Sequence, residues 1–106
     1  MELKLPIYDG DKIVKTYTTE TINFSFGIVE DILNALNVEE MKTGDNKEIA
    51  VMILRCSKQL KPFLMDLFMG VTAEEIRHTK IQDLIIVFRG LYQYATGEIM
   101  NATAKN

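Results

Sequence analysis

The sequence has little of what disulfides, secretion or a membrane span require. Among its 106 residues there is one cysteine, Cys56, which cannot form an intramolecular disulfide. The N-terminus lacks the continuous apolar segment of a signal peptide, so we expect a reducing cytoplasm as the location. Purely apolar runs such as residues 84–88 are far shorter than the roughly 20 residues of a membrane-spanning helix, which predicts a protein without a membrane span.

Excess positive charge and phosphate-binding motifs are also missing. The formal net charge is −3, whereas nucleic-acid binders normally need a basic surface, so we expect no direct nucleic-acid partner. The acidic glycine turn Asp9-Gly10-Asp11 lacks the further acids of a calcium loop. No glycine-rich pattern for binding phosphates is present, and we expect no cofactor.

Catalytic groups are equally scarce. Cys56 falls on an apolar stripe with Met52 and Ile53, where a thiol behaves as a small hydrophobe, and a nucleophile would need an adjacent base. The single histidine, His78, is separated from Cys56 by an expected helix break. Glu75-x-x-His78 is half of a four-helix di-metal motif and would need a second copy, so we expect a surface histidine, no metal and no enzyme activity.

What the sequence does have is the composition of one globular domain, with 47% hydrophobic and 25% charged residues. At the N-terminus, Leu3, Leu5 and Ile7 alternate with polar residues or proline, and Asp9-Gly10 precedes a β-branched run. This pattern predicts a hairpin over residues 2–18, with a type I′ turn and an edge strand at Pro6.

Helical patterns fill the rest. Ser25 is expected to cap a helix that ends near Asn37, and the polar run 39–46 is expected to be a loop. Asp45 should cap a second helix, which Pro62 either kinks or restarts. A further helical piece should end at Gly70, whose position tolerates left-handed geometry.

Two capping boxes are predicted after Gly70. Thr72 with Glu75 should begin a short acidic helix, and Thr79 with Gln82 should begin a last helix that ends at Gly97. The predicted fold is therefore α+β and mainly α-helical, with an N-terminal β-hairpin followed by four or five helices. A single domain should span residues 1–100, with the helical part at 25–99 and a frayed tail at 101–106.

The last helix has more apolar residues than one stripe needs. It should therefore be buried all round or expose an apolar patch to a partner. We expect Phe88, Leu91, Tyr92 and Tyr94 to be the first candidates for a partner-binding surface, with some of them in the core. A second reading takes residues 72–80 as the reading helix of a helix-turn-helix regulator, although its N-terminal acids would face phosphates.

The sequence pattern of the C-terminal half is similar to that of a known family. The run from Lys61 to Ile76, KPFLMDLFMGVTAEEI, followed by LIIVF at 84–88, resembles the tail assembly chaperones of long-tailed phages and prophages of Gram-positive bacteria. The hairpin, the Phe24-Ser25-Phe26 approach to a helix and the acidic linker are similar to that family's layout, so the resemblance covers roughly residues 1–100.

This resemblance implies a non-enzymatic protein of the host bacterial cytoplasm. It would bind the tape measure protein and other tail proteins, assist tail tube assembly and be absent from the mature virion; self-association is an additional expectation. A structural tail or connector protein is the third reading, and such a protein would be found in purified particles.

The family often makes a longer product by a −1 ribosomal frameshift near the end of the short frame. Lys105-Asn106 can be encoded within a slippery heptamer, and we hypothesise that slippage occurs there. The nucleotide sequence tests this hypothesis, because a codon other than AAA at Lys105 would contradict slippage at this point. An ordinary frayed terminus is the alternative.

Overall fold

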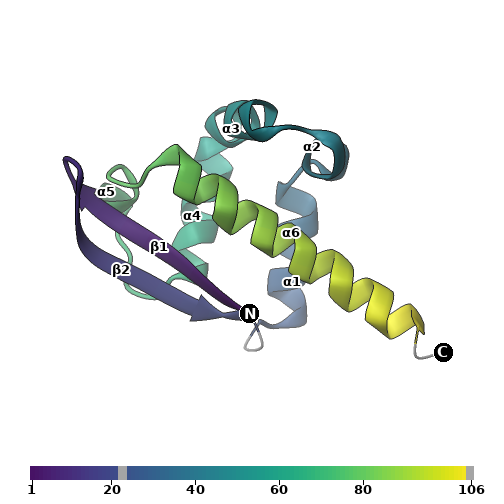
Figure 1. The fold of residues 1–106 in the computed structure, drawn as a ribbon. Helices are drawn as coiled ribbons and strands as arrows, with labels where there is room; N and C mark the ends of the chain where they lie inside the picture. The colour runs from purple at the N-terminus through teal and green to yellow at the C-terminus, as the bar shows by residue number, and fades with distance from the viewer. Residues whose placement is uncertain (22–23, 105–106) are drawn as a thin grey trace.

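The computed structural model describes residues 1–21 and 24–104, and Figure 1 shows their arrangement. The fold is α+β and mostly helical with an N-terminal antiparallel two-stranded hairpin, as predicted. Six helices follow the hairpin in the described range, where four or five were predicted. The elements are β1 (Glu2–Asp9), β2 (Lys12–Glu20), α1 (Phe26–Ala35), α2 (Val38–Thr43), α3 (Asn46–Arg55), α4 (Ser57–Leu67), α5 (Ala73–Ile76) and α6 (Ile81–Ala104).

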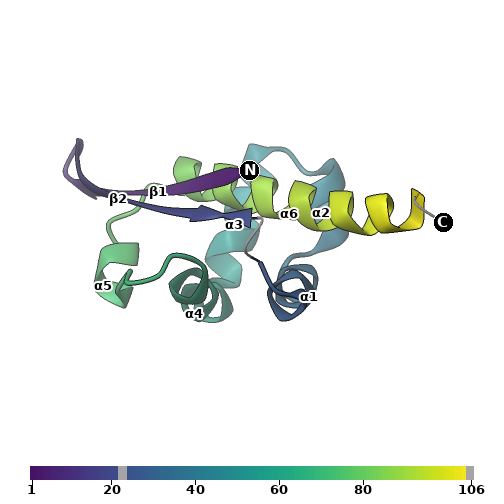
Figure 2. The ribbon, with the colours of Figure 1, turned by 90° about the horizontal axis from the view of Figure 1, so that it is seen from below.

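Helix α6 is the central element of the fold. It contacts β1 and the helices α1, α2 and α3. Figure 2 shows the hairpin lying beside the first half of α6, with α1, α4 and α5 in a second layer against them. The C-terminal end of α6 extends past the rest of the chain in both views (Figures 1 and 2).

The hairpin packs one face of β1 inward. Leu3, Leu5 and Ile7 are buried, whereas β2 is mostly exposed because nothing in the described structure covers its outer side. The two-residue loop has one positive φ, +62° at Gly10, and none of the non-glycine residues that the structure describes has a positive φ. The predicted type I′ turn is therefore wrong, because it needs two positive φ angles; one at the first loop position is the pattern of type II′.

Three predicted helix starts are confirmed. The side chains of Ser25, Asp45 and Thr72 each accept a hydrogen bond from the backbone N–H three residues later, as N-caps do. At Thr72 the capping box is complete, because Glu75 also accepts the Thr72 N–H. Gly70 has the expected left-handed geometry, with a φ of +93°.

The loop predicted for residues 39–46 is wrong in its first half. Helix α2 occupies Val38–Thr43, capped by Asn37, whose side chain accepts the N–H of Glu40. Met41, only 3% exposed, anchors this helix in the core. A helix of six residues with one such anchor has no apolar periodicity to detect.

The second helix ends earlier than expected. The chain leaves helical geometry at Cys56 (φ −99°, ψ 14°), and α4 then runs through Pro62 to Leu67 without interruption. Pro62 lies in the second turn of α4, where its missing N–H removes one backbone bond from a helix that buries four apolar residues. Packing of that face outweighs the loss.

Both predicted ends of the last helix are also wrong. Helix α6 begins at Ile81, and Thr79 does not cap it, because its hydroxyl donates to the Ile76 carbonyl at 2.7 Å. At the other end the helix passes through Gly97 and continues to Ala104. Glycine lowers helix propensity by only about 1 kcal/mol, which a long helix tolerates.

The core lies between β1, α6 and the remaining helices. Phe68 and Phe88 are its largest fully buried side chains. β1 crosses α6 closely at Gly90, where an added Cβ would lie 2.8 Å from Cδ2 of Leu3. None of the helices in the described range has both the length and the apolar character needed to cross a bilayer.

Candidate protein-binding groove

The four residues first expected to bind a partner are not equally accessible. Phe88 and Leu91 are 0% exposed and belong to the core. Tyr92 and Tyr94 are half-buried, and the Tyr94 ring lies edge-on against Phe24 with 5.6 Å between ring centroids. Two of the four side chains therefore cannot reach a partner while the fold is intact, and binding by the two tyrosines stays a prediction. Lys105 and Asn106, the proposed frameshift point, lie outside the described residues.

An apolar groove opens instead between α3, α4, α5 and the first half of α6. Its volume is about 230 Å³. The lining side chains come from the end of α3, from α4, from the segment around α5 and from the start of α6: Ile53, Leu54, Ser57, Leu60, Lys61, Leu64, Ile76, Thr79, Ile81, Leu84 and Phe88. Of these, Leu54, Lys61 and Ile81 are exposed, and the others are partly or fully buried. We call this the α4–α6 groove.

The α4–α6 groove is apolar to its edge. Leu54 at its rim is 67% exposed, and Ile81 on the opposite rim is also exposed. Lys61 is the only ionisable side chain of the lining, and Ser57 and Thr79 supply neutral hydroxyl groups. Such a surface can bind apolar side chains by removing them from water, and it offers no carboxylate or imidazole for chemistry.

Of the four residues proposed from the sequence, one, Phe88, is among the lining side chains, and it is fully buried. The sequence analysis missed the exposed Leu54, which lies outside the buried stripe of α3. An exposed leucine next to that stripe was the available signal, because it broadens the apolar face beyond what the core uses.

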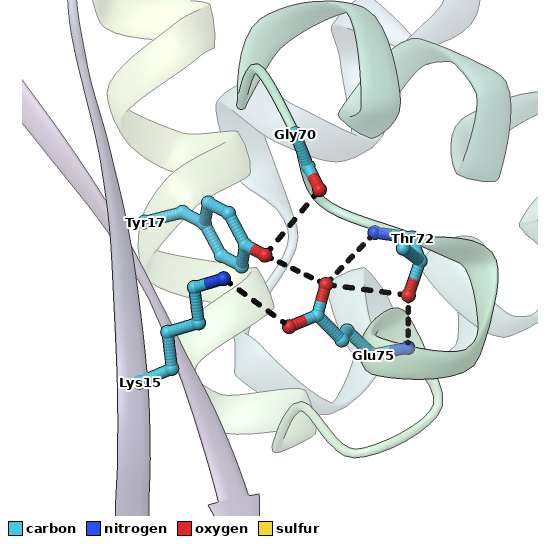
Figure 3. Close-up of polar contacts among 5 residues, drawn as sticks. All are labelled: Lys15, Tyr17, Gly70, Thr72 and Glu75. Carbon is cyan, nitrogen blue, oxygen red and sulfur yellow. Dashed lines mark hydrogen bonds and ion pairs between the residues drawn. The ribbon is translucent and has the colours of Figure 1, made fainter.

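A polar cluster fixes one wall of the groove. Figure 3 shows the carboxylate of Glu75 on α5 between β2 and the start of α5. Its Oε1 accepts hydrogen bonds from the Tyr17 hydroxyl at 2.7 Å and from the Thr72 N–H at 3.0 Å, and its Oε2 lies 3.9 Å from Nζ of Lys15. We call Lys15, Tyr17, Thr72 and Glu75 the hairpin–α5 clip.

Electrostatics favour the ionised form of Glu75 in this clip. The Tyr17 hydroxyl, the Thr72 N–H and the Lys15 ammonium together lower the pKa of the carboxyl below its ordinary value of 4.5, with Tyr17 the largest cause. The Tyr17 hydroxyl also lies 3.3 Å from the Gly70 carbonyl oxygen. Because Ile76 follows Glu75 and lines the groove, the clip holds that wall against the hairpin.

Glu75 and His78, the two residues of the Glu-x-x-His spacing, contact different partners. The carboxylate of Glu75 faces the hairpin, while the exposed His78 ring lies 3.4 Å from Oε1 of Glu74. Cys56 is partly buried at the junction of α3 and α4. Within residues 1–21 and 24–104, no three His, Cys, Asp or Glu side chains come together as a metal site would require.

A second exposed apolar feature lies away from the groove. Phe26 at the start of α1 is 82% exposed, and Met69 just after α4 is 91% exposed. α1 and α4 pack against each other, and the start of one and the end of the other lie at the same edge of the molecule (Figure 1). Apolar surface is thus present on two separate parts of the chain.

Comparisons of the chain with protein-family models, with curated proteins and with solved structures found no match.

Proposed function

We propose that this protein is a non-enzymatic tail assembly chaperone of a long-tailed phage or prophage. It binds the tape measure protein in the host cytoplasm, assists assembly of the tail tube together with other tail proteins, and is absent from the finished virion. The observation that carries the proposal is the α4–α6 groove, in which Leu54 and Ile81 are exposed beside a largely buried apolar lining and Lys61 is the one ionisable lining side chain.

The size of the groove sets the strength of each contact. A cavity of about 230 Å³ has room for one or two apolar side chains of a partner. Each buried side chain contributes roughly 1.5–3 kcal/mol, and a millimolar dissociation constant corresponds to about 4 kcal/mol. One groove is therefore a weak binder, and many copies along an elongated partner are needed for tight coverage.

Weak, repeated and apolar contacts suit a protein that keeps another chain from aggregating. Exposed hydrophobic segments of the partner are covered reversibly, and every copy is released when the partner finds its final assembly. The exposed Phe26 and Met69 add apolar surface at a separate edge, so that one copy can contact a partner at two places.

Co-expression with the tape measure protein encoded nearby tests the proposal. The chain should raise the fraction of tape measure protein that stays in the supernatant after centrifugation and should co-purify with it. Leu54→Glu should abolish both effects, because a carboxylate at the rim opposes burial of an apolar side chain. Val51→Glu is the matched control, since Val51 is an exposed apolar residue of the same helix that does not line the groove.

Two results would contradict the proposal. One is an equal amount of tape measure protein in the supernatant with and without the chain. The other is detection of the chain in purified, mature particles at a stoichiometric level, which a structural tail or connector protein would give.

A DNA-reading role has weaker support. Helix α5 has four residues, and Glu74 at its start is exposed. One turn of helix is too short to lie along a major groove, and its first residues would bring carboxylates to the phosphates. Salt-dependent retention of the chain on DNA would revive this reading.

A further inference from the structure

The α5 wall of the α4–α6 groove is a short segment that is held from two sides. Helix α5 is a single turn of four residues, which is too short to be stable without tertiary contacts. Its apolar anchors are Val71 and Ile76, which are 4% and 6% exposed. On the side of the hairpin its contacts are polar (Figure 3). The position of this wall therefore depends on β2 as well as on the core.

A short path of hydrogen bonds and backbone leads from β2 to the lining of the groove. The Tyr17 hydroxyl donates to Oε1 of Glu75 at 2.7 Å, and Glu75 immediately precedes Ile76. The Ile76 carbonyl accepts the Thr79 hydroxyl at 2.7 Å and the Thr79 N–H at 3.1 Å. Ile76, Thr79 and Ile81 all line the groove, and Ile81 is exposed at its rim. A displacement of Glu75 should therefore move the lining residues that follow it.

The hairpin makes a second contact of the same kind that does not involve this wall. The Tyr8 hydroxyl donates to Oδ2 of Asp83, also at 2.7 Å. Asp83 precedes the lining residue Leu84, but it belongs to α6, a helix of 24 residues that also packs on α1, α2 and α3. The loss of the Tyr8 bond should therefore leave the groove in place, whereas the loss of the Tyr17 bond frees one side of α5.

We propose that Tyr17 is a positioning residue for partner binding, because its hydrogen bond to Glu75 keeps the α5 wall of the α4–α6 groove in the geometry that a partner needs. This inference rests on the proposed function, since it names a residue that controls the same groove. Without the bond, the wall has more freedom in the free chain and loses that freedom when an apolar side chain of the partner binds. Binding is weakened for this reason, although Tyr17 is not among the lining residues.

The coupling between β2 and the groove is reciprocal. If the Tyr17–Glu75 contact favours binding, a bound partner must favour that contact by the same factor. The Thr72 N–H donates to the same Oε1 of Glu75 at 3.0 Å and reports on the contact. In hydrogen exchange, the peptide that contains Thr72 should exchange more slowly when the tape measure protein is bound, and this slowing should be absent in Tyr17→Phe.

Two tyrosine variants test the role of Tyr17, with binding to immobilised tape measure protein measured by surface plasmon resonance. Tyr17→Phe should weaken binding about threefold to tenfold, the range of one hydrogen bond. Tyr8→Phe is the matched control, because it removes a hydroxyl that makes a bond of the same length to another carboxylate, and it should leave the affinity unchanged. Urea unfolding should show a similar loss of stability in both variants, which separates positioning from general destabilisation.

A double variant identifies the acceptor. Glu75→Ala removes the carboxylate that accepts the Tyr17 hydroxyl and should weaken binding at least as much as Tyr17→Phe does. In the Glu75→Ala background, Tyr17→Phe should have no further effect on the affinity, because two residues that act through one contact are not additive.

Two results would overturn the inference while the parent chain still binds the tape measure protein. One is an equal effect of Tyr17→Phe and Tyr8→Phe on the affinity. The other is a further loss of affinity when Tyr17→Phe is added to Glu75→Ala. In either case only the positioning role is wrong. If the parent chain itself does not bind the tape measure protein, the proposed function fails and this inference fails with it.

Discussion

Replacing a glycine of α6 by alanine should have opposite effects at two positions of the same helix. Alanine has a helix propensity about 1 kcal/mol more favourable than glycine. At Gly97 an added Cβ meets nothing within 4 Å, so Gly97→Ala should raise the free energy of unfolding by up to about 1 kcal/mol.

At Gly90 the same methyl group would lie 2.8 Å from Cδ2 of Leu3 on β1. Leu3 is buried, so its side chain can move only by disturbing the packing of the strand on the helix. Overpacking of this kind costs about 1–3 kcal/mol. After the propensity gain is subtracted, Gly90→Ala should lower the free energy of unfolding by about 1 kcal/mol.

Urea unfolding monitored by circular dichroism measures both variants. The Leu3→Val background supplies the internal check, because valine has no Cδ carbon; in that background Gly90→Ala should become neutral or stabilising. If Gly90→Ala stabilises the otherwise unaltered chain as much as Gly97→Ala does, β1 does not cross α6 at this glycine and the described packing is wrong.

The other predictions concern buried packing and two hydrogen-bonded carboxylates. Phe88→Ala should lower the free energy of unfolding by about 3–5 kcal/mol in urea unfolding, because Phe88 is 0% exposed in the core. Glu75→Gln should destabilise the protein at pH 7, and the difference from the parent should shrink as pH falls through the lowered pKa of Glu75, since protonation removes the same interaction. Asp83→Asn should lower the pKa of Tyr8, followed by ultraviolet absorbance, because the hydrogen bond from the Tyr8 hydroxyl to Asp83 raises it above 10.0.

Each of these has a contrary outcome. A loss below 1 kcal/mol for Phe88→Ala would mean that the side chain is not enclosed. A pH-independent difference for Glu75→Gln would remove the clip as its cause. An unchanged tyrosine titration in Asp83→Asn would show that Tyr8 does not donate to that carboxylate.

Local signals predicted much of the fold. The alternation at Leu3, Leu5 and Ile7 identified the hairpin, and the caps at Ser25, Asp45 and Thr72 marked three helix starts. These signals operate over a few residues, so the sequence contains them completely.

What the sequence missed depends on tertiary contacts. Helix α2 has one buried anchor, Met41, so its stability depends on the packing of this side chain against the rest of the fold. Pro62 predicts a kink or a restart of the helix, because proline removes a backbone hydrogen bond. In the structure, the packing of four buried side chains of α4 compensates for that lost bond. Of the residues proposed for a partner surface, Phe88 and Leu91 are core residues, since helical spacing identifies an apolar face but not what covers it.

The hairpin register has a consequence far along the chain. Tyr17 pairs with Leu5 across the two strands, and this pairing aims its hydroxyl at Glu75. A slip of one residue between the strands would turn Tyr17 to the opposite side of the ribbon. The strand pairing near the N-terminus therefore determines whether α5 is tied to the hairpin, and a shifted pairing would leave the α5 wall of the groove without its contacts to Tyr17 and Lys15.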